Sequence, residues 1–266
     1  MGMIEAKNER FWQCMDRGAK IERMALDVKQ PRATLFSRRG YLLIADPGTG
    51  RILRWERNQS GVAREGVAVE SITFDHQGRL LACEKDKVTR TEKNGAMTLL
   101  APARQPRDLV YAIDGSVYYT AEGTVFQVTR ERAGVGGKAG AGTVRAVAKE
   151  GGQYVALAPN QSKLYVSDAQ GVIRVYDVAA DGALGAGRVF VRAACQGLKT
   201  DEAGNVWTAT KGGIAVFDAQ GAELGLVRLT EAANNLNWGS GFRGLYVTGE
   251  AGVHHFPTKT NGTRTY

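Results

Sequence analysis

Residues 201–225, DEAGNVWTATKGGIAVFDAQGAELG, read as a strand, a turn, a second strand and a second turn. Five other stretches repeat the beginning of this phrase: a tight turn, usually with glycine, followed by alternating β-branched, aromatic and aliphatic residues, which is typical of a strand. With the copy just quoted, the six matches are RRGYLLIAD (38–46), HQGRLLACE (76–84), IDGSVYYTA (113–121), NQSKLYVSD (160–168), EAGNVWTAT (202–210) and GFRGLYVTG (241–249).

Each match belongs to a longer unit. An apolar strand precedes it, as in ATLFS and SITFD, another follows it, as in RILRWE and VIRVYDV, and a weaker fourth strand is visible in AMTLLA, VRAVAK, GRVFVR and LGLVRL. Four strands in a unit of about 40 residues are typical of a β-propeller blade. The sequence therefore predicts an all-β, six-bladed β-propeller.

Ring closure removes the exposed edges of a row of blades, and it requires one strand from outside the repeats. Residues 19–28, AKIERMALDV, are expected to supply the outer strand of the last blade. Within residues 1–18, the spacing of Phe11, Cys14 and Met15 predicts a short helix that covers one rim. The expected organisation is thus a helical extension at 1–18 and the propeller at 19–266. The glycine-rich residues 131–145 are expected to form a hairpin loop within the third blade.

Composition limits the classes of function. The chain of 266 residues is 43% hydrophobic, enough for a substantial core, and has no apolar run long enough to span a membrane. Its N-terminus is charged and does not resemble a secretory signal, so we expect a cytoplasmic protein with no membrane partner. The three cysteines form no metal pattern, which favours reduced, structural thiols.

The net charge of +8 raises the question of nucleic acid binding. Lysines and arginines are scattered singly or in pairs, with no basic run and no nucleic-acid motif. This pattern favours a solvated basic surface over a nucleic-acid partner, with a modest attraction for small anions.

The stretch SITFDHQGRLLACEKDKVTR resembles the second blade of the senescence marker protein, gluconolactonase and luciferin-regenerating-enzyme-like family. GYLLIADPGTGRILRW, RDLVYAIDGSVYYT, SKLYVSDAQGVIRVYDV, GLKTDEAGNVWTAT and NNLNWGS match the other blades in order. The resemblance implies a six-bladed propeller. It also implies the activity of a sugar lactonase or related esterase, with a divalent metal, commonly calcium or zinc, at one end of the central channel.

One polar residue stands at the start of each expected inner strand, at intervals of 37 to 46 residues, where it can face the channel mouth. These residues are Arg32, Glu70, Arg107, Gln153, Gln196 and Asn235. By resemblance, the family's metal-binding Glu, Asn and Asp fall on Arg32, Gln153 and Gln196, and a further Asn falls on Arg107. One carboxylate facing two guanidiniums does not suit calcium, so we expect that the metal site is lost and that there is no cofactor.

These replacements are polar, which favours a pocket for an anion. Arg32 and Arg107 are the expected carboxylate or phosphate donors, and Glu70 is the candidate general acid or base. The amides of Gln153, Gln196 and Asn235 are expected to bind substrate hydroxyls. The alternative is a closed polar network in which Glu70 pairs with one of the arginines.

Three functions stay open. The first is a metal-independent, lactonase-like hydrolase acting on a small anionic or polyhydroxylated molecule. The second is a non-catalytic propeller that binds a metabolite or a protein. The third is a metal-dependent sugar lactonase with atypical ligands. The sequence does not indicate an oligomeric state.

Other chemistry-bearing residues are given structural roles. Asp46, Glu84 and Asp168 end the second strands of three blades, where turn capping is favoured over a place beneath the mouth. His254 and His255 are adjacent on a strand and must face opposite ways, so they cannot chelate one ion together. No GxSxG elbow accompanies them.

Overall fold

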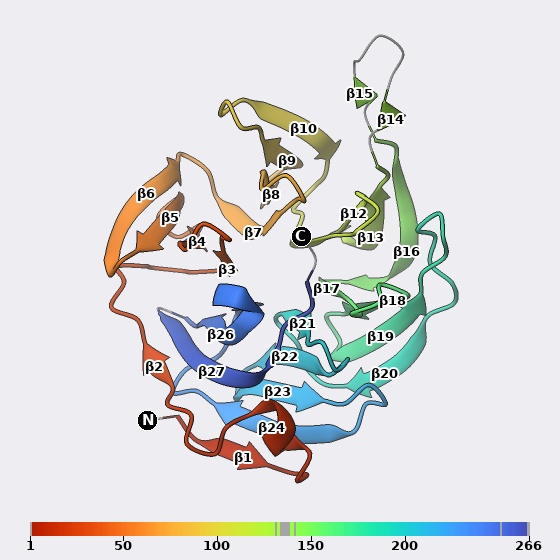
Figure 1. The fold of residues 1–266 in the computed structure, drawn as a ribbon. Helices are drawn as coiled ribbons and strands as arrows, with labels where there is room; N and C mark the ends of the chain where they lie inside the picture. The colour runs from red at the N-terminus through yellow and green to blue at the C-terminus, as the bar shows by residue number, and fades with distance from the viewer. Residues whose placement is uncertain (1, 131, 134–138, 141, 251, 265–266) are drawn as a thin grey trace.

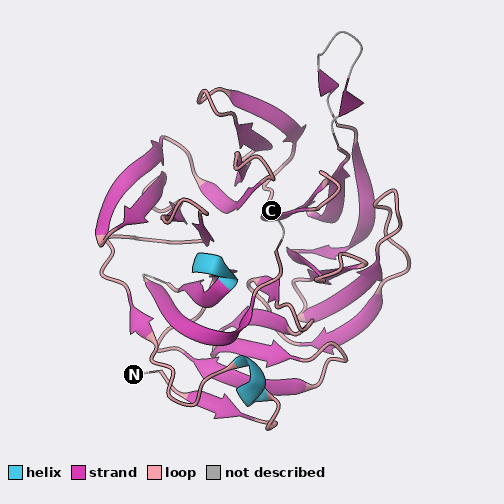
Figure 2. Cartoon of the chain, viewed as in Figure 1, coloured by secondary structure: helices cyan, strands magenta, loops and turns pink. Residues whose placement is uncertain are grey.

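In the computed structural model, six antiparallel sheets of at least four strands surround one central axis (Figure 1). The structure describes residues 2–130, 132–133, 139–140, 142–250 and 252–264. Nearly all of the regular structure in these residues is strand (Figure 2). The predicted all-β, six-bladed propeller is therefore confirmed.

The blades follow one another along the chain, and each is numbered from its innermost strand outward. The first three blades are β3(Ala33–Phe36), β4(Leu42–Asp46), β5(Arg51–Glu56) and β6(Gln59–Glu65); β7(Val69–Phe74), β8(Leu80–Glu84), β9(Lys87–Thr91) and β10(Met97–Pro102); and β11(Asp108–Tyr111), β12(Val117–Ala121), β13(Gly123–Val128) and β16(Val144–Gly152). The short pair β14(Arg132–Ala133) and β15(Ala139–Gly140) forms a hairpin between β13 and β16, where the glycine-rich loop was expected. Val144 and Arg145 of that stretch already belong to β16, and residues 131, 134–138 and 141 lie outside the described ranges.

The last three blades repeat this order. They are β17(Tyr154–Leu157), β18(Lys163–Ser167), β19(Val172–Asp177) and β20(Arg188–Arg192); β21(Leu198–Thr200), β22(Val206–Thr210), β23(Gly213–Phe217) and β24(Glu223–Arg228); and β25(Asn235–Trp238), β26(Arg243–Thr248) and β27(Val253–Asn261), with the 3₁₀ turn η1(Ser240–Phe242) between β25 and β26.

The repeated Asp-x-x-Gly phrase forms the turn between the first two strands of a blade. In the second blade, Asp75 Oδ1 accepts hydrogen bonds from the backbone N–H groups of Gln77 and Arg79, both at 2.9 Å. Gly78 sits in this turn with φ 72°, a conformation that costs glycine little. Asp201 makes the same bonds to Ala203 and Asn205 in the fifth blade. The carboxylate thus fixes the turn that the sequence repeat marks.

The blades are held together by apolar side chains packed between neighbouring sheets. Between the fifth and sixth blades, the rings of Trp207 and Trp238 meet edge to face at 5.4 Å. Phe11 and Met15 of the N-terminal segment are fully buried in the same cluster. Each propeller interface is therefore a small core of its own, and the N-terminal segment completes one of them.

The ring closes as the sequence predicts. β2(Glu22–Arg23) pairs with β27 through Glu22–His255 and Arg23–His254, and becomes the outer strand of the last blade. The predicted short N-terminal helix is present, and the first 18 residues also contain a strand that was not expected. The helix α1(Phe11–Cys14) is a single turn, and β1(Ile4–Ala6) adds a fifth strand to the fifth blade by pairing with β24. This strand is too short for an alternating pattern to reveal it.

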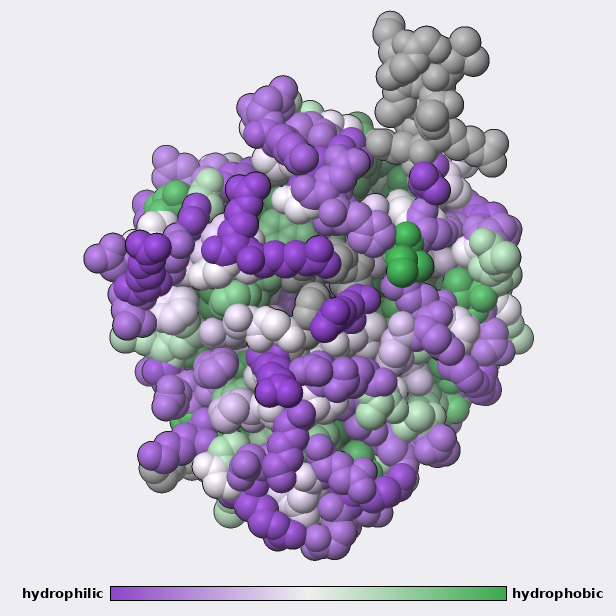
Figure 3. Space-filling view, viewed as in Figure 1, coloured by the Kyte–Doolittle hydropathy of each residue, from purple (hydrophilic) through white to green (hydrophobic). Residues whose placement is uncertain are grey.

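The end of the described chain covers one end of the central channel, near the axis in Figure 1. The N–H of Thr263 donates to Thr200 O at 2.9 Å, and its hydroxyl donates to Asp201 O at 3.2 Å. Around the axis, the face in this view shows hydrophilic residues beside neutral and hydrophobic ones (Figure 3). No helix in the described part of the chain is long and apolar enough to cross a membrane.

Candidate functional site

The six predicted channel residues lie at the beginnings of the six inner strands. Arg32 and Arg107 directly precede β3 and β11, Gln153 precedes β17, Gln196 lies two residues before β21, Glu70 lies in β7, and Asn235 begins β25. Contacts between blades link these strand beginnings around the axis: Arg32 with Glu70, Ser71 with Asp108, Arg107 with Tyr154, and Gly197 beside Asn235. The structure therefore places the six at the same end of the channel, opposite Thr263, but among the six only Arg32 and Glu70 contact each other through their side chains within the described ranges.

Arg32 and Glu70 approach each other without forming a tight pair. Arg32 Nε lies 4.0 Å from Glu70 Oε2, and 33% and 43% of their side chains remain exposed. Glu70 occupies a bulge, because the register of β7 shifts between Val69 and Ser71. The bulge takes Glu70 out of the regular ladder and leaves its carboxylate accessible to a ligand.

Arg107 is exposed and finds a phenol rather than a carboxylate. Its Nη1 donates to Tyr154 Oη at 3.3 Å, and its guanidinium carbon lies 5.9 Å from the centre of the Tyr154 ring. Burial raises the pKa of the Tyr154 hydroxyl, partly offset by the hydrogen bond from Arg107. The phenol thus stays neutral, and the positive charge of Arg107 is not cancelled by a carboxylate within the described ranges.

The three amides are not equivalent. The side chain of Asn235 is 5% exposed, and its Oδ1 accepts a hydrogen bond from the N–H of Leu236 at 2.8 Å. Gln153 and Gln196 are half-buried, and their carboxamides make no hydrogen bond to any described residue. These two glutamines have donors and acceptors to offer a ligand, whereas Asn235 already belongs to the wall.

The carboxylate of Asp108 lies directly beneath the mouth and was not among the candidates predicted from the sequence. Asp108 is fully buried; Ser71 Oγ donates to its Oδ1 at 2.6 Å, and the N–H of Val155 donates to its Oδ2 at 3.0 Å. These bonds join the second, third and fourth blades. The only sequence signal was its place beside Arg107 in the stretch PRD.

The two cysteines near this carboxylate are not nucleophiles. Burial and the negative charge of Asp108 raise the pKa of the Cys83 thiol well above its usual value. Burial likewise raises the pKa of Cys195 to about 12. Both therefore remain thiols at neutral pH, where the thiolate would be the reactive and metal-binding form.

The acidic residues that end the second strands behave differently from one another. Asp168 accepts hydrogen bonds from the N–H groups of Gln170 and Val172 and caps its turn as predicted. Asp46 accepts a hydrogen bond from Thr49 Oγ1 at its own turn, but the N–H groups that donate to it are those of Lys29 and Gln30, in the segment that leads to Arg32. Glu84 does not cap a turn.

Glu84 instead forms a buried contact between two blades. Arg64 of the first blade donates to its Oε1 at 2.8 Å, and Thr89 Oγ1 donates to the same oxygen at 2.6 Å. The carboxylate of Glu84 is therefore already satisfied and is not available at the mouth.

The histidines take structural roles. His254 Nε2 lies 2.6 Å from Glu231 Oε1, whereas the ring of His255 packs on Tyr246 with centroids 4.6 Å apart. Burial lowers the pKa of His255, which keeps its ring neutral at pH 7. The two adjacent rings have different neighbours, as the strand geometry predicts.

The mouth does not fit the divalent metal that the resemblance implies. Its accessible charges are the carboxylate of Glu70 and the guanidiniums of Arg32 and Arg107, while Asp108 is already occupied by two donors. Within the described ranges, no group of three His, Cys, Asp or Glu side chains is placed to hold an ion. A calcium ion needs six to eight oxygen ligands, which this set does not offer.

Below the mouth, the channel narrows to a cavity of about 40 Å³ lined by the inner strands, among them Leu35, Ile72 and Val155. The indole of Trp238 and the Thr263 contacts close its far end. A ligand of the size of a sugar acid must therefore sit at the mouth rather than inside the channel.

Known structures resemble the whole chain. A protein described as a candidate gluconolactonase is 21% identical, with a TM-score of 0.84 over 98% of this chain and 100% of its own. A gluconolactonase from Xanthomonas campestris is 20% identical, with a TM-score of 0.82 over 97% of each chain. The calcium-binding protein regucalcin from Agrobacterium tumefaciens is 12% identical, with a TM-score of 0.73 over 90% of this chain and 92% of its own. At these identities, the likeness shows the fold.

No curated protein sequence matches this chain. A family sequence profile does match: the SMP-30/Gluconolactonase/LRE-like region, over residues 32–251. This range begins at Arg32 and includes all six mouth residues, so the matched region and the propeller nearly coincide. The chain belongs to the SMP-30/gluconolactonase/LRE-like family.

Proposed function

We propose that the channel mouth binds a small, anionic, hydroxylated molecule of the sugar-acid or sugar-lactone type and hydrolyses the lactone without a metal ion. One observation carries this proposal. Arg32 and Glu70 approach each other to 4.0 Å and Arg107 stands at the start of the next inner strand, yet none of these three charged side chains forms an ion pair shorter than 4.0 Å within the described part of the chain. A closed polar network would have paired these charges with one another, so side chains left without a close ion pair favour a ligand.

Each side chain has a role that its chemistry supports. A guanidinium binds a carboxylate through two parallel hydrogen bonds, which suits Arg107 and Arg32 to a sugar acid. The free carboxamides of Gln153 and Gln196 can bind hydroxyl groups. Family relatives carry the name gluconolactonase, and this donor set matches the carboxylate and hydroxyls of gluconate.

The hydrolysis would proceed by general base catalysis. Glu70 takes a proton from a water molecule, whose oxygen forms a bond to the lactone carbonyl carbon. The guanidiniums of Arg32 and Arg107 stabilise the negative charge that develops on the carbonyl oxygen. The ring carbon–oxygen bond then breaks, and the proton held by Glu70 passes to the leaving oxygen.

A second candidate is binding of the sugar acid without turnover. It is favoured by the single accessible carboxylate of the mouth, because Asp108 and the two thiols are excluded from acid–base chemistry by their partners or by burial. We also propose a cytoplasmic location, with which the three buried free thiols agree.

The test uses chelator-treated protein with glucono-δ-lactone in a pH-stat and with gluconate in a calorimeter. Glu70→Gln should lower turnover by about 100-fold or more and leave gluconate affinity nearly unchanged. Arg107→Ala should weaken gluconate binding, whereas Arg17→Ala, at the exposed N-terminal segment, should change neither.

Gluconate binding without turnover would favour the binding function over the hydrolase. Turnover that appears only with added calcium or zinc would contradict the proposal. It would show that a metal binds at a mouth whose side chains do not suit it.

A further inference from the structure

A second groove lies far from the channel mouth, between the first and second blades. Its volume is about 530 Å³, within the range of small-molecule sites. Two connections at the far ends of inner strands form its walls: residues 37–41 between β3 and β4, and residues 75–79 between β7 and β8. We call it the blade 1–2 groove.

The blade 1–2 groove is strongly basic. Its lining holds five cationic side chains against two carboxylates. The cations are Arg38, Arg39, Arg54, Arg79 and Lys93, and the carboxylates are Asp75 and Glu92. The net excess of positive charge will attract an anion and is only partly screened inside a concave surface.

Two of the cations have no partner for their charge. Arg79 donates to Asp75 Oδ2 at 2.6 Å, and Arg54 donates to Glu56 at 2.6 Å. The side chains of Arg39 and Lys93, by contrast, make no hydrogen bond or ion pair to a described residue, and both are exposed. Arg39 comes from the first blade and Lys93 from the second, so an anion between them would be held from both sides.

The floor of the groove is apolar. Tyr41 and Leu80 are the half-buried apolar residues of this lining, with the buried Leu43 and Phe74 behind them, and the guanidinium of Arg54 stacks over the Tyr41 ring at 4.1 Å from the centroid. Apolar walls with a few charged groups at the rim are typical of sites that recognise organic ligands. An inorganic anion alone would leave this surface uncovered.

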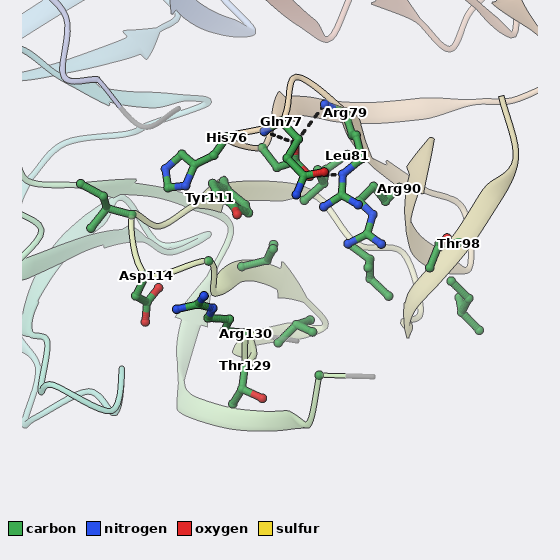
Figure 4. A pocket seen from close by; sticks show the side chains of 18 residues that line it. His76, Gln77, Arg79, Leu81, Arg90, Thr98, Tyr111, Asp114, Thr129 and Arg130 are labelled. Carbon is green, nitrogen blue, oxygen red and sulfur yellow. Dashed lines mark hydrogen bonds and ion pairs between the residues drawn. The ribbon is translucent and has the colours of Figure 1, made fainter. Parts of the chain in front are cut away.

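The neighbouring groove between the second and third blades provides a matched comparison (Figure 4). It shares residues 75–79 as a wall and has a similar volume, about 630 Å³. Its lining holds three cations, Arg79, Arg90 and Arg130, against the carboxylates of Asp75 and Asp114. Only one of these cations, Arg130, makes no ion pair within the described ranges, so a ligand could be held there from one side alone.

We propose that the blade 1–2 groove is a second ligand site, which binds a small organic phosphate or sulfonate with an aromatic body. The anionic group lies between Arg39 and Lys93, and the aromatic body covers Leu80 and Tyr41 beside the guanidinium of Arg54. This site is independent of the function proposed for the channel mouth, because it shares no residue with it.

The test is calorimetric titration with 1-naphthyl phosphate, with inorganic phosphate as the probe that lacks the apolar body. One binding site is expected for 1-naphthyl phosphate, and inorganic phosphate should bind at least about tenfold more weakly because it buries no apolar surface. Arg39→Gln and Lys93→Gln should each weaken binding of 1-naphthyl phosphate by about two- to fivefold, the usual effect of an exposed ion pair.

Two control variants locate the site. Arg130→Gln alters the neighbouring groove and Arg107→Ala alters the channel mouth, so both should bind 1-naphthyl phosphate as the unmodified protein does. Equal affinity for inorganic phosphate would overturn the organic class of ligand. Loss of binding in Arg130→Gln or Arg107→Ala but not in Arg39→Gln, or no binding at millimolar concentration, would overturn the site itself.

Discussion

Replacing Asp108 tests whether hydrogen bonds or charge join the blades beneath the mouth. In Asp108→Ala, the N–H of Val155 loses its acceptor inside the protein, which costs about 1–3 kcal/mol for a buried group. The hydroxyl of Ser71 also loses its acceptor, but it can rotate toward another, so we assign it about 1 kcal/mol. The expected loss of unfolding free energy is therefore about 2–4 kcal/mol.

Asp108→Asn separates the two explanations. Its carboxamide oxygen can still accept from Val155, and its NH₂ group can donate to Ser71 Oγ, so both contacts survive with one direction reversed. We expect a loss of about 1 kcal/mol or less. In a chain of this length, about 3 kcal/mol corresponds to a fall in Tm of roughly 5 °C, which calorimetry and urea unfolding at pH 7 will resolve.

The comparison has a clear failing outcome. If Asp108→Asn is as unstable as Asp108→Ala, the negative charge itself is required and the hydrogen-bond account is wrong. If both variants are as stable as the unmodified protein, the contacts among the three blades contribute nothing measurable.

Three further predictions concern the packing of Gly197 against Asn235, the reactivity of the thiols and the stability of the fold at acid pH. A Cβ on Gly197 would lie 2.5 Å from Asn235 Oδ1, so Gly197→Ala should lower the unfolding free energy by about 1–3 kcal/mol. Gly61 has open space around it, so Gly61→Ala should leave the unfolding free energy nearly unchanged. Equal effects of the two substitutions in urea titrations would contradict this prediction. Because burial raises the pKa of Cys14 and Cys195 to about 12, the native protein should react with DTNB at pH 8 only as fast as it unfolds, and rapid labelling would show that the thiols are accessible. Burial raises the pKa of Asp168, but hydrogen bonds from the N–H of Val172 and from Arg174 outweigh burial and hold this pKa below its usual value. The carboxylate therefore stabilises the fold at pH values above its unfolded pKa, and this stability is lost as the pH falls through the lower folded pKa. Arg174→Gln should raise the pH midpoint of acid unfolding, measured by circular dichroism.

The sequence repeat made the strands of each blade predictable, but the contacts between blades could not be predicted. A strand such as GNVWTAT shows its alternation and its turn in the sequence itself, and the spacing of Arg32, Glu70 and Arg107 followed from one residue per blade. The pairing of Arg64 with Glu84, or of Ser71 with Asp108, depends on how two sheets lie against each other. No local pattern carries that information.

The candidate site shows the same division. The place of each residue at the start of an inner strand was predictable from the repeat. The availability of each side chain was not, because the bulge at Glu70 and the phenol beside Arg107 decide it. Asn235 has the same polar character as Gln153 in the sequence, yet the structure buries it against Gly197.

The two N-terminal strands set the order in which the protein can finish folding during its synthesis. β1 pairs with β24 and β2 with β27, so both are made first and must wait for partners that emerge more than 200 residues later. The first four blades are built from consecutive strands and can form as soon as each leaves the ribosome. The last two blades can mature only when the start of the chain returns to them, which makes their assembly a natural late step.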